Sequence, residues 1–329
     1  MKLIKTIVSC ILIIGCISLT SFAALGYKQT YHIIPNVQFT QSWMNFIMPS
    51  TLLVDIVLPG SHDAGAYDMF EYAETQAATI GEQLAGGVRY FDLRLDGAGE
   101  LVFYHGINSD NKFEDAAYEI NLFVENNPTE FLVLNFQHFR NNGHHKALEV
   151  IDRVMNPSKY ALSGDVDLST LTYQDVLDKG ARYMILFGTS KQEILSRSYI
   201  YNRSHFINSP YNSNNHNKGI DTLINSFAYY SNLRLDNKFF VLQAQSTAGL
   251  FLPTPSAFEL THSERLNQEI TSFGDENSPV SLQNTNIIMR DYILRNRDNI
   301  PTILALNLKK GVVSNPSVFE IQINNLFNG

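Results

Sequence analysis

The chain has 329 residues, of which 44% are hydrophobic and 17% are charged, and its formal net charge is −8. This composition is typical of a globular protein with a sizeable core, and it excludes a largely disordered chain. The acidic balance excludes a general attraction to nucleic acid or to anionic bilayers, because polyanion binders usually show clustered positive charge. Any attraction to a membrane must therefore come from a limited part of the protein surface rather than from its net charge.

The first 24 residues have the pattern of a signal peptide. Two lysines precede an apolar run at residues 7–14, which is too short for a membrane span, and small residues follow it. We expect cleavage near Ala23 or Ala24 and a secreted or periplasmic protein. The alternative is a lipoprotein, in which residues 13–16 form the processing site and Cys16 carries a lipid. Both cysteines of the chain lie in this leader, so cleavage near Ala24 would leave neither a disulfide nor a cysteine nucleophile.

Beyond the leader, segments typical of strands alternate with segments typical of amphipathic helices. The expected strands are residues 53–58, 88–95, 101–104, 131–137, 183–187, 239–243 and 286–291, and the expected helices are residues 76–85, 113–124, 256–273 and 301–308. This alternation is typical of βα units around a parallel sheet or barrel. Residues 190–237 are rich in Asn, Ser and Tyr, which favours long surface loops within one domain.

Three short segments place polar side chains at the ends of expected strands. They are LPGSHD at 58–63, YFDLR at 90–94 and YHG at 104–106. In βα barrels the C-terminal ends of the strands build the active site, so polar residues there are strong catalytic candidates.

The residues of these segments suit acid/base chemistry on a phosphate. His62 and His105 can act as base and acid because the unperturbed pKa of histidine, roughly 6.5, lies close to neutral pH. Asp63 and Asp92 are carboxylates that can tune them. Arg94 offers a fixed positive fork for phosphate oxygens and can stabilise developing charge without a metal. The set predicts cleavage of a phosphodiester.

Each residue also has a structural interpretation. His62 could cap the loop after a strand, Asp92 and Arg94 could form an ordinary ion pair, and His105 could be a buried imidazole with satisfied hydrogen bonds. The functional interpretation depends on the occurrence of all three clusters at strand ends.

Six segments follow one another along the chain: LPGSHDAG (58–65), GEQLAGGVRYFDLRL (81–95), VFYHG (102–106), ENNPTEFLVLNFQHF (125–139), FVLQAQ (240–245) and IIMRDY (287–292). Taken together and in this order, they resemble the X domain of phosphatidylinositol-specific phospholipases C of the metal-independent type. Trp43 and Met44 make the chain most similar to the X-domain-containing branch. The resemblance implies a single-domain α/β fold, a distorted (βα) TIM-type barrel over residues 51–329 that follows an N-terminal segment at residues 25–50. It also implies a monomer that contacts a membrane peripherally and cleaves phosphatidylinositol or a glycosylated form of it.

The resemblance assigns roles to individual residues. It implies that His62 deprotonates the inositol 2-hydroxyl, which attacks the neighbouring phosphorus, and that His105 protonates the departing diacylglycerol oxygen. The two histidines would then exchange roles to hydrolyse the cyclic inositol phosphate. Asp291 matches the carboxylate that holds the base histidine in its working tautomer, and Asp63 matches the carboxylate beside the acid histidine.

The resemblance also implies a reaction without a metal. Asp92 would position Arg94, whose guanidinium touches the phosphate in the metal-free branch. In the calcium-dependent branch, acidic and amide ligands occupy the places of Asp63, Asp92 and Arg94, so an arginine there would repel calcium. Neither a metal nor another cofactor is expected.

Other polar residues have weaker signals. Asn135 and Gln137 alternate on one face of their strand, where relatives line the inositol pocket, so they are candidate substrate-binding residues; a polar pair satisfied by water or backbone is the structural alternative. Some bacterial relatives place an inositol-binding arginine after the strand that here ends at Phe187, whereas this chain reads Gly-Thr-Ser at 188–190.

Two further groups have alternative interpretations. The spacing of His138, His144 and His145 lacks the pattern of recognised zinc sites, and no metal is expected there. Tyrosines of the long loops could dip into a lipid interface, but ordinary packing explains them equally well; they are Tyr201, Tyr211, Tyr229 and Tyr230.

Two rival functions remain open. A phosphodiesterase of the same fold could act on another phospholipid or on a glycerophosphodiester, and such a protein would generally need a divalent metal. A non-catalytic inositol-phosphate-binding module would have no need of an acid/base pair.

Overall fold

Eight parallel strands follow one another around the sheet in the order of the chain. The pairing order is β7-β6-β5-β2-β1-β10-β9-β8, so β10 returns to pair with β1, and β7 and β8 are the two unpaired edges. The strands are β1 Leu58–Ser61, β2 Tyr90–Asp96, β5 Leu132–Arg140, β6 Tyr183–Phe187, β7 Ile200–Asn202, β8 Ile207–Asn208, β9 Phe239–Gln243 and β10 Ile287–Arg290. This curled, incompletely closed sheet confirms the predicted α/β fold, a distorted TIM-type barrel in a single domain.

The computed structural model describes residues 37–212, 218–246 and 253–328, all of which belong to one compact unit. The predicted signal peptide at residues 1–24, the lipidation site Cys16 and the first part of the segment 25–50 lie outside the described residues.

The central strands are apolar because both of their faces are covered. All five residues of β6 and all five of β9 are buried. A parallel strand between a barrel interior and an outer layer of helices has no face for water, so it reads as a continuous hydrophobic run. Because of these hydrophobic runs, the strands expected at residues 183–187 and 239–243 have the same bounds as the observed β6 and β9.

An antiparallel hairpin extends β2. Strand β3, Val102–His105, pairs with β2 and with β4, Ile107–Lys112. Gly106 joins the two hairpin strands with φ +71°, a left-handed conformation that glycine adopts without a steric cost. The hairpin places His105 near the end of β2.

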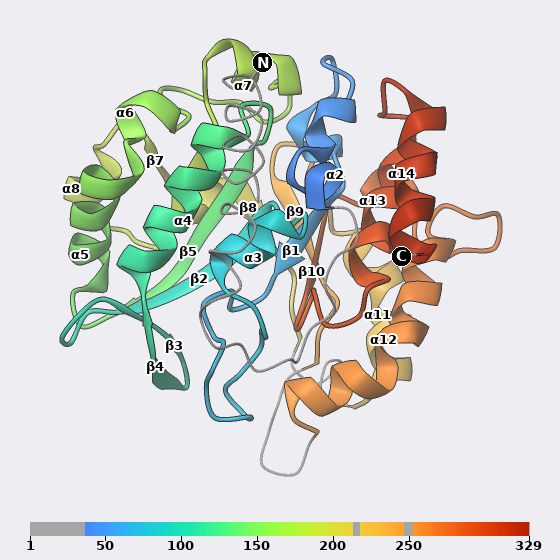
Figure 1. Cartoon of the computed structure of the whole chain (residues 1–329), viewed down its shortest axis with the longest axis horizontal. Coiled ribbons are helices and arrows are strands. Elements are labelled where there is room, and N and C mark those ends of the chain that lie inside the picture. Colours follow the sequence, from blue (N-terminus) through green and yellow to red (C-terminus); the bar gives the residue numbers. More distant parts are fainter. Residues whose placement is uncertain (1–36, 213–217, 247–252, 329) are drawn as a thin grey trace, which may run out of the picture. The chain divides into compact units, whose positions relative to one another are not determined.

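The helices lie outside the sheet, as Figure 1 shows. The α-helices are α2 Val37–Gln41, α3 Ile80–Ala85, α4 Phe113–Asn126, α5 Gly143–Val150, α6 Pro157–Tyr160, α7 Tyr173–Asp178, α8 Gln192–Leu195, α9 Arg203–Phe206, α11 Ile220–Ser231, α12 Pro255–Ser272, α13 Asn299–Lys310 and α14 Pro316–Asn328. Short 3₁₀ turns are η1 Trp43–Phe46, η2 Leu53–Asp55 and η4 Leu282–Asn284, and η3 Ile151–Met155 is a π-helical turn. None of the described helices is both long and apolar enough to cross a bilayer.

The described part of the N-terminal segment packs against the barrel. Trp43 is fully buried, and its Nε1–H donates to the carbonyl of Gly87. Arg89 donates to the carbonyls of Thr40 and Gln41 and forms a buried ion pair with Glu130, at 2.7 Å between Nη2 and Oε2.

Several expected boundaries are wrong. Residues 53–55 form η2, and β1 begins only at Leu58, because the Asn286 amide donates to the carbonyls of Leu53 and Ile56. Helix α3 begins at Ile80 rather than at residue 76, because Thr79 and Glu82 form a capping box. Helix α13 begins two residues before Pro301.

The region 190–237 is not only loops. It contains α8, β7, α9, β8 and the twelve-residue α11, whose buried face includes Leu223 and Phe227. Of the four tyrosines considered for a lipid interface, Tyr201 and Tyr230 are buried, whereas Tyr211 and Tyr229 are exposed.

Candidate active site

A cavity of about 680 Å³ lies at the C-terminal ends of the barrel strands. His62 and Asp291 follow β1 and β10, Arg94 belongs to β2, and His105 ends β3. All four line the cavity, as does Gln137 of β5. The structure therefore brings together residues that the sequence placed at separate strand ends.

Two unusual backbone conformations direct the side chains after β1 and β10. Asp63 has φ 40° and Tyr292 has φ 44°, both in the left-handed region, which is costly for residues other than glycine. The amide of Ala64 donates to the carbonyl of Asp92 at 2.8 Å, and that of Tyr292 donates to the carbonyl of Thr75 at 2.6 Å. These bonds hold the two strained turns in place.

His62 and Asp291 are in direct contact. Nδ1 of His62 lies 2.7 Å from Oδ1 of Asp291, and Asp291 is 3% exposed. An ionised Asp291 holds a proton on Nδ1, which leaves Nε2 of neutral His62 free to accept a proton. This is the tautomer that a general base needs.

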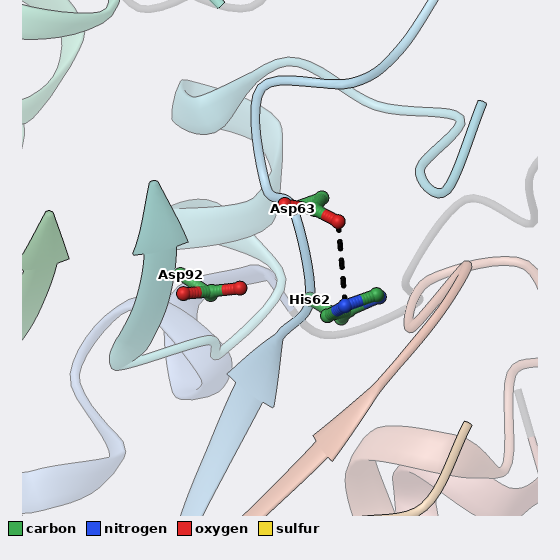
Figure 2. A group of neighbouring side chains, drawn as sticks. All are labelled: His62, Asp63 and Asp92. Carbon is green, nitrogen blue, oxygen red and sulfur yellow. Dashed lines mark ion pairs between the residues drawn. The ribbon is translucent and has the colours of Figure 1, made fainter. Parts of the chain in front are cut away.

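Asp63 contacts both histidines. Its Oδ2 lies 3.3 Å from Nε2 of His62 and 3.4 Å from Nε2 of His105, and its Oδ1 lies 2.6 Å from Nε of Arg94. Figure 2 shows the Asp63 carboxylate facing His62. Asp63 is 2% exposed. A proton on either Nε2 atom therefore faces the same carboxylate.

His105 is held by the backbone of a neighbouring turn. Its Nδ1–H donates to the carbonyl of Ala73 at 2.9 Å, which directs Nε2 towards Asp63. The ring centroids of His62 and His105 are 6.1 Å apart. Two imidazoles with their Nε2 atoms facing one carboxylate can move protons on opposite sides of one reacting group.

Arg94 is fixed by the protein but stays accessible. Its Nε–H donates to Oε1 of Gln137 at 3.1 Å, and its Nη2 lies 3.8 Å from Oδ2 of Asp92. The Arg94 side chain is 23% exposed. A partly open guanidinium beside two carboxylates is positioned to bind phosphate oxygens.

Asn135 lies behind the cavity wall rather than on it. Its side chain is fully buried, and its Nδ2 donates to the Tyr90 hydroxyl at 2.8 Å and to Oδ1 of Asp92 at 3.1 Å. Its Oδ1 accepts from Nε of Arg203 at 3.0 Å. The contact of Asn135 with a substrate stays a prediction, and the observed bonds give Asn135 the role of orienting Asp92 and Arg203.

Burial shifts the pKa values of the histidines. Desolvation lowers the pKa of His62 against the pull of Asp63, and it lowers the pKa of His105 against the carbonyl of Ala73. Both imidazoles therefore favour the neutral form more than a histidine in water does.

Burial has the opposite effect on the carboxyl groups. Desolvation raises the pKa of Asp63 and of Asp92, and it raises that of Asp291 well above its ordinary value. Burial also opposes the charge on Arg94, but Asp63 and Asp92 outweigh it and raise the pKa of Arg94. Arg94 stays charged.

Three side chains shown in Figure 2 could be considered as metal ligands. Candidate ligand atoms of His62, Asp63 and Asp92 lie within 4.8 Å of one another, and within the described ranges this is the only such group of His, Cys, Asp and Glu. Arg94 already occupies the Asp63 carboxylate as a fixed cation. A divalent ion would have to share that carboxylate with a permanent positive charge, so the set fits a metal poorly.

Several cavity residues were not predicted as site residues, among them one arginine and two glutamines. Arg203, Gln243 and Gln245 line the cavity from the ends of β7 and β9. Nε2 of Gln245 donates to Oε1 of Gln243, whose Nε2 donates to the hydroxyl of Ser209. The place of Gln243 and Gln245 in the FVLQAQ motif is the signal that could have found them. Arg203 had no such signal.

No protein-family model matches the chain. The chain is 28% identical over 182 residues to PI-PLC X domain-containing protein 2 of Homo sapiens, which covers 44% of this chain and 59% of the human protein. It is 28% identical over 117 residues to the 1-phosphatidylinositol phosphodiesterase of Listeria monocytogenes, which covers 33% of this chain and 36% of that protein. The chain thus spans about a third to three fifths of these relatives' lengths.

Solved structures share the fold. The phosphatidylinositol-specific phospholipase C from Listeria monocytogenes superposes with a TM-score of 0.59 at 17% identity, over 82% of this chain and 98% of that one. The enzyme from Staphylococcus aureus gives a TM-score of 0.61 at 16% identity, over 81% and 97%. The chain therefore has the fold of bacterial phosphatidylinositol-specific phospholipases C and is similar in sequence to proteins with a PI-PLC X domain, as its motifs predict.

Proposed function

We propose that the protein is a phospholipase C that cleaves phosphatidylinositol, or a glycosylated form of it, to diacylglycerol and inositol cyclic phosphate. The observation that carries the proposal is the arrangement of His62, His105 and Arg94 around one buried carboxylate, Asp63, in the cavity at the strand ends. An acid, a base and a fixed cation within one cavity are what an in-line displacement at phosphorus requires.

The first step uses the substrate's own nucleophile. Nε2 of His62 takes the proton of the inositol 2-hydroxyl, and that oxygen bonds to phosphorus. The bond from phosphorus to the glycerol oxygen breaks, and Nε2–H of His105 gives its proton to that oxygen. Arg94 stabilises the charge on the remaining phosphate oxygens. In the second step His105 activates water, the cyclic ester opens, and His62 returns its proton to the 2-oxygen.

The rim of the cavity supports a lipid substrate. Phe70, Tyr72, Ile107 and Tyr211 line the cavity and are exposed, with Phe70 at 62% and Ile107 at 51%. Aromatic side chains favour the boundary between water and lipid. The rim can rest on a membrane surface while the head group enters the cavity, which makes the protein a peripheral membrane protein.

The reaction is proposed to need no metal. Arg94 supplies the positive charge beside the phosphate that a divalent ion would otherwise supply. The group of His62, Asp63 and Asp92 is the observation that favours the rival, a metal-dependent phosphodiesterase of the same fold.

Purified full chain should be incubated with phosphatidylinositol vesicles and, separately, with phosphatidylcholine vesicles, each in excess chelator. The proposal expects diacylglycerol from the first and none from the second. Activity that appears only when a divalent ion is added would favour the metal-dependent rival, and binding without turnover would favour the non-catalytic module.

Residues 1–24 are proposed to direct export, which leaves a secreted or periplasmic protein. The mass of the mature protein tests this, because cleavage near Ala24 and lipidation of Cys16 give different N-termini.

A further inference from the structure

One buried side-chain amide closes the turn that carries Asp291. Gln76 is 1% exposed. Its Nε2 donates to the carbonyl of Arg290 at 3.1 Å, and its Oε1 accepts the backbone N–H of Ile293 at 3.3 Å. Arg290 and Ile293 flank Asp291 and the left-handed Tyr292. A single side chain therefore binds the backbone on both sides of this strained turn.

The same amide also binds the backbone of the proposed base. Nε2 of Gln76 donates to the carbonyl of His62 at 2.9 Å, so its two N–H groups serve two carbonyls. The last residue pair in the register of β1 with β10 is Ser61 with Arg290, and the N–H of His62 donates to the Arg290 carbonyl at 3.1 Å. The chain after β1 then turns at the left-handed Asp63. Gln76 thus extends the contact between the two strands beyond their backbone pairing.

The turn after β10 needs such support. A left-handed conformation at a residue other than glycine persists only where the surroundings over-determine it. The carbonyl of Thr75 accepts the N–H of Tyr292 at 2.6 Å, and the three hydrogen bonds of Gln76 hold the residues on either side. The segment that precedes α3 therefore fixes the backbone of both His62 and Asp291.

A matching amide lies at the opposite end of the same two strands. Asn286 directly precedes β10 and is fully buried. Its Nδ2 donates to the carbonyls of Leu53 and Ile56, and its Oδ1 accepts the N–H of Phe240 at 3.1 Å. Gln76 and Asn286 thus make the same set of backbone hydrogen bonds, but Gln76 makes them at the end where the proposed catalytic side chains lie.

We propose that Gln76 is a positioning residue of the reaction, which holds the Asp291 carboxylate against Nδ1 of His62 by closing the turn after β10. Gln76 contacts the backbone of His62 rather than its ring, so it takes no part in proton transfer. The inference rests on the proposed function, because it assigns how the proposed base is kept in its working tautomer.

Gln76→Met replaces the amide by an apolar side chain of similar length, and Asn286→Leu is the matched control. Both changes, made in the full chain, should lower the free energy of unfolding by similar amounts, because each removes a buried amide that makes three backbone hydrogen bonds. Gln76→Met should lower kcat on phosphatidylinositol about 10- to 100-fold with KM unchanged, because a small displacement of a catalytic group has an effect of this size. It should also shift or remove the Nδ1 proton resonance of His62. Asn286→Leu should change neither.

Gln76→Asn keeps the amide but shortens its reach, so it should move kcat and the resonance in the same direction by less, and it replaces Gln76→Met if that variant does not fold. An unchanged His62 resonance in the folded Gln76 variants, or an equal loss of kcat in Gln76→Met and Asn286→Leu, would overturn the assignment. The resonance separates this inference from the proposed function. A wild-type protein that does not cleave phosphatidylinositol contradicts the proposed function, while the resonance still reports whether Gln76 holds Asp291 against His62.

Discussion

Nδ1 of His62 lies 2.7 Å from Oδ1 of Asp291, although 229 positions separate the two residues in the sequence. The contact follows from the pairing of β1 with β10, in which Ser61 is opposite Arg290. The residues that follow a pair of adjacent strands must emerge side by side. The same register that closes this side of the barrel therefore orients the proposed base.

Asp291→Asn should lower kcat about 10²- to 10⁴-fold, because the amide can hold the ring in the wrong tautomer. The Nδ1 proton resonance of His62 in the NMR spectrum should shift or disappear. A small change in kcat with an unchanged resonance would contradict the role of Asp291.

The same variant should not unfold the protein. Burial raises the pKa of Asp291, so the folded state binds its proton more tightly than the unfolded state, and ionisation of Asp291 costs stability as the pH rises. An asparagine at this position cannot ionise, so the variant does not have this cost. The gain offsets the loss of the hydrogen bond between His62 and the Asp291 carboxylate. Thermal unfolding at neutral pH checks this.

His105→Ala and His62→Ala should respond differently to the leaving group. Both changes should remove most activity on phosphatidylinositol. A substrate with an acidic phenol as leaving group needs no proton donor, so it should restore much of the activity of His105→Ala but not that of His62→Ala. If this substrate restores the activity of both variants equally, the assignment of His62 as the base and His105 as the acid is contradicted.

The pH profile should be bell-shaped with its optimum on the acid side of 6.5. Activity requires neutral His62 and protonated His105, and burial lowers the pKa of both from the ordinary 6.5. His62 therefore stays neutral to lower pH, and His105 loses its proton before the pH reaches 6.5. The dependence of kcat/KM on pH gives two apparent pKa values, one for each limb of the profile. These values belong to the coupled pair of histidines rather than to either residue alone. An alkaline optimum would be inconsistent with these assignments.

Removal of the rim aromatics should affect vesicles more than soluble substrates. Phe70→Ala with Tyr72→Ala removes exposed side chains from the turn whose Ala73 carbonyl holds His105. Cleavage of vesicle lipid should fall about tenfold or more, at an estimated 1.4 kcal/mol of lost interfacial binding. Leu122→Ala, an exposed apolar change on α4, is the control. An equal loss on a soluble substrate would mean that the turn acts only by positioning His105.

Glu130→Ala should destabilise the fold by about 3–5 kcal/mol, because it leaves Arg89 buried and unpaired. Urea unfolding measures the loss. Glu114→Ala, which breaks the exposed pair with Arg153, should change stability little. If both variants lose the same free energy of unfolding, the ion pair of Arg89 with Glu130 does not stabilise the packing of the N-terminal segment on the barrel.

The sequence predicted those parts of the site that directly follow strong strand patterns. His62 and Asp291 directly follow the buried strands β1 and β10, Arg94 lies near the end of β2, and His105 ends β3. The contact of Asp63 with both histidines depends on its left-handed φ of 40°, which no residue pattern reveals.

Arg203 could not be predicted for a different reason. Strand β7, which carries it to the cavity, has only three residues, and β8 has two. Segments this short show no periodicity, so the region reads as loop. Their position is set by packing against β6 and β9, which the sequence does not encode locally.

Phosphorus NMR of phosphatidylinositol vesicles, incubated with the full chain in excess chelator, tests the proposed mechanism most directly. We predict that the resonance of a five-membered cyclic inositol phosphate appears first and later gives way to inositol 1-phosphate, and that His62→Ala produces neither. Inositol 1-phosphate without a preceding cyclic resonance, or turnover that requires an added divalent ion, would contradict the account.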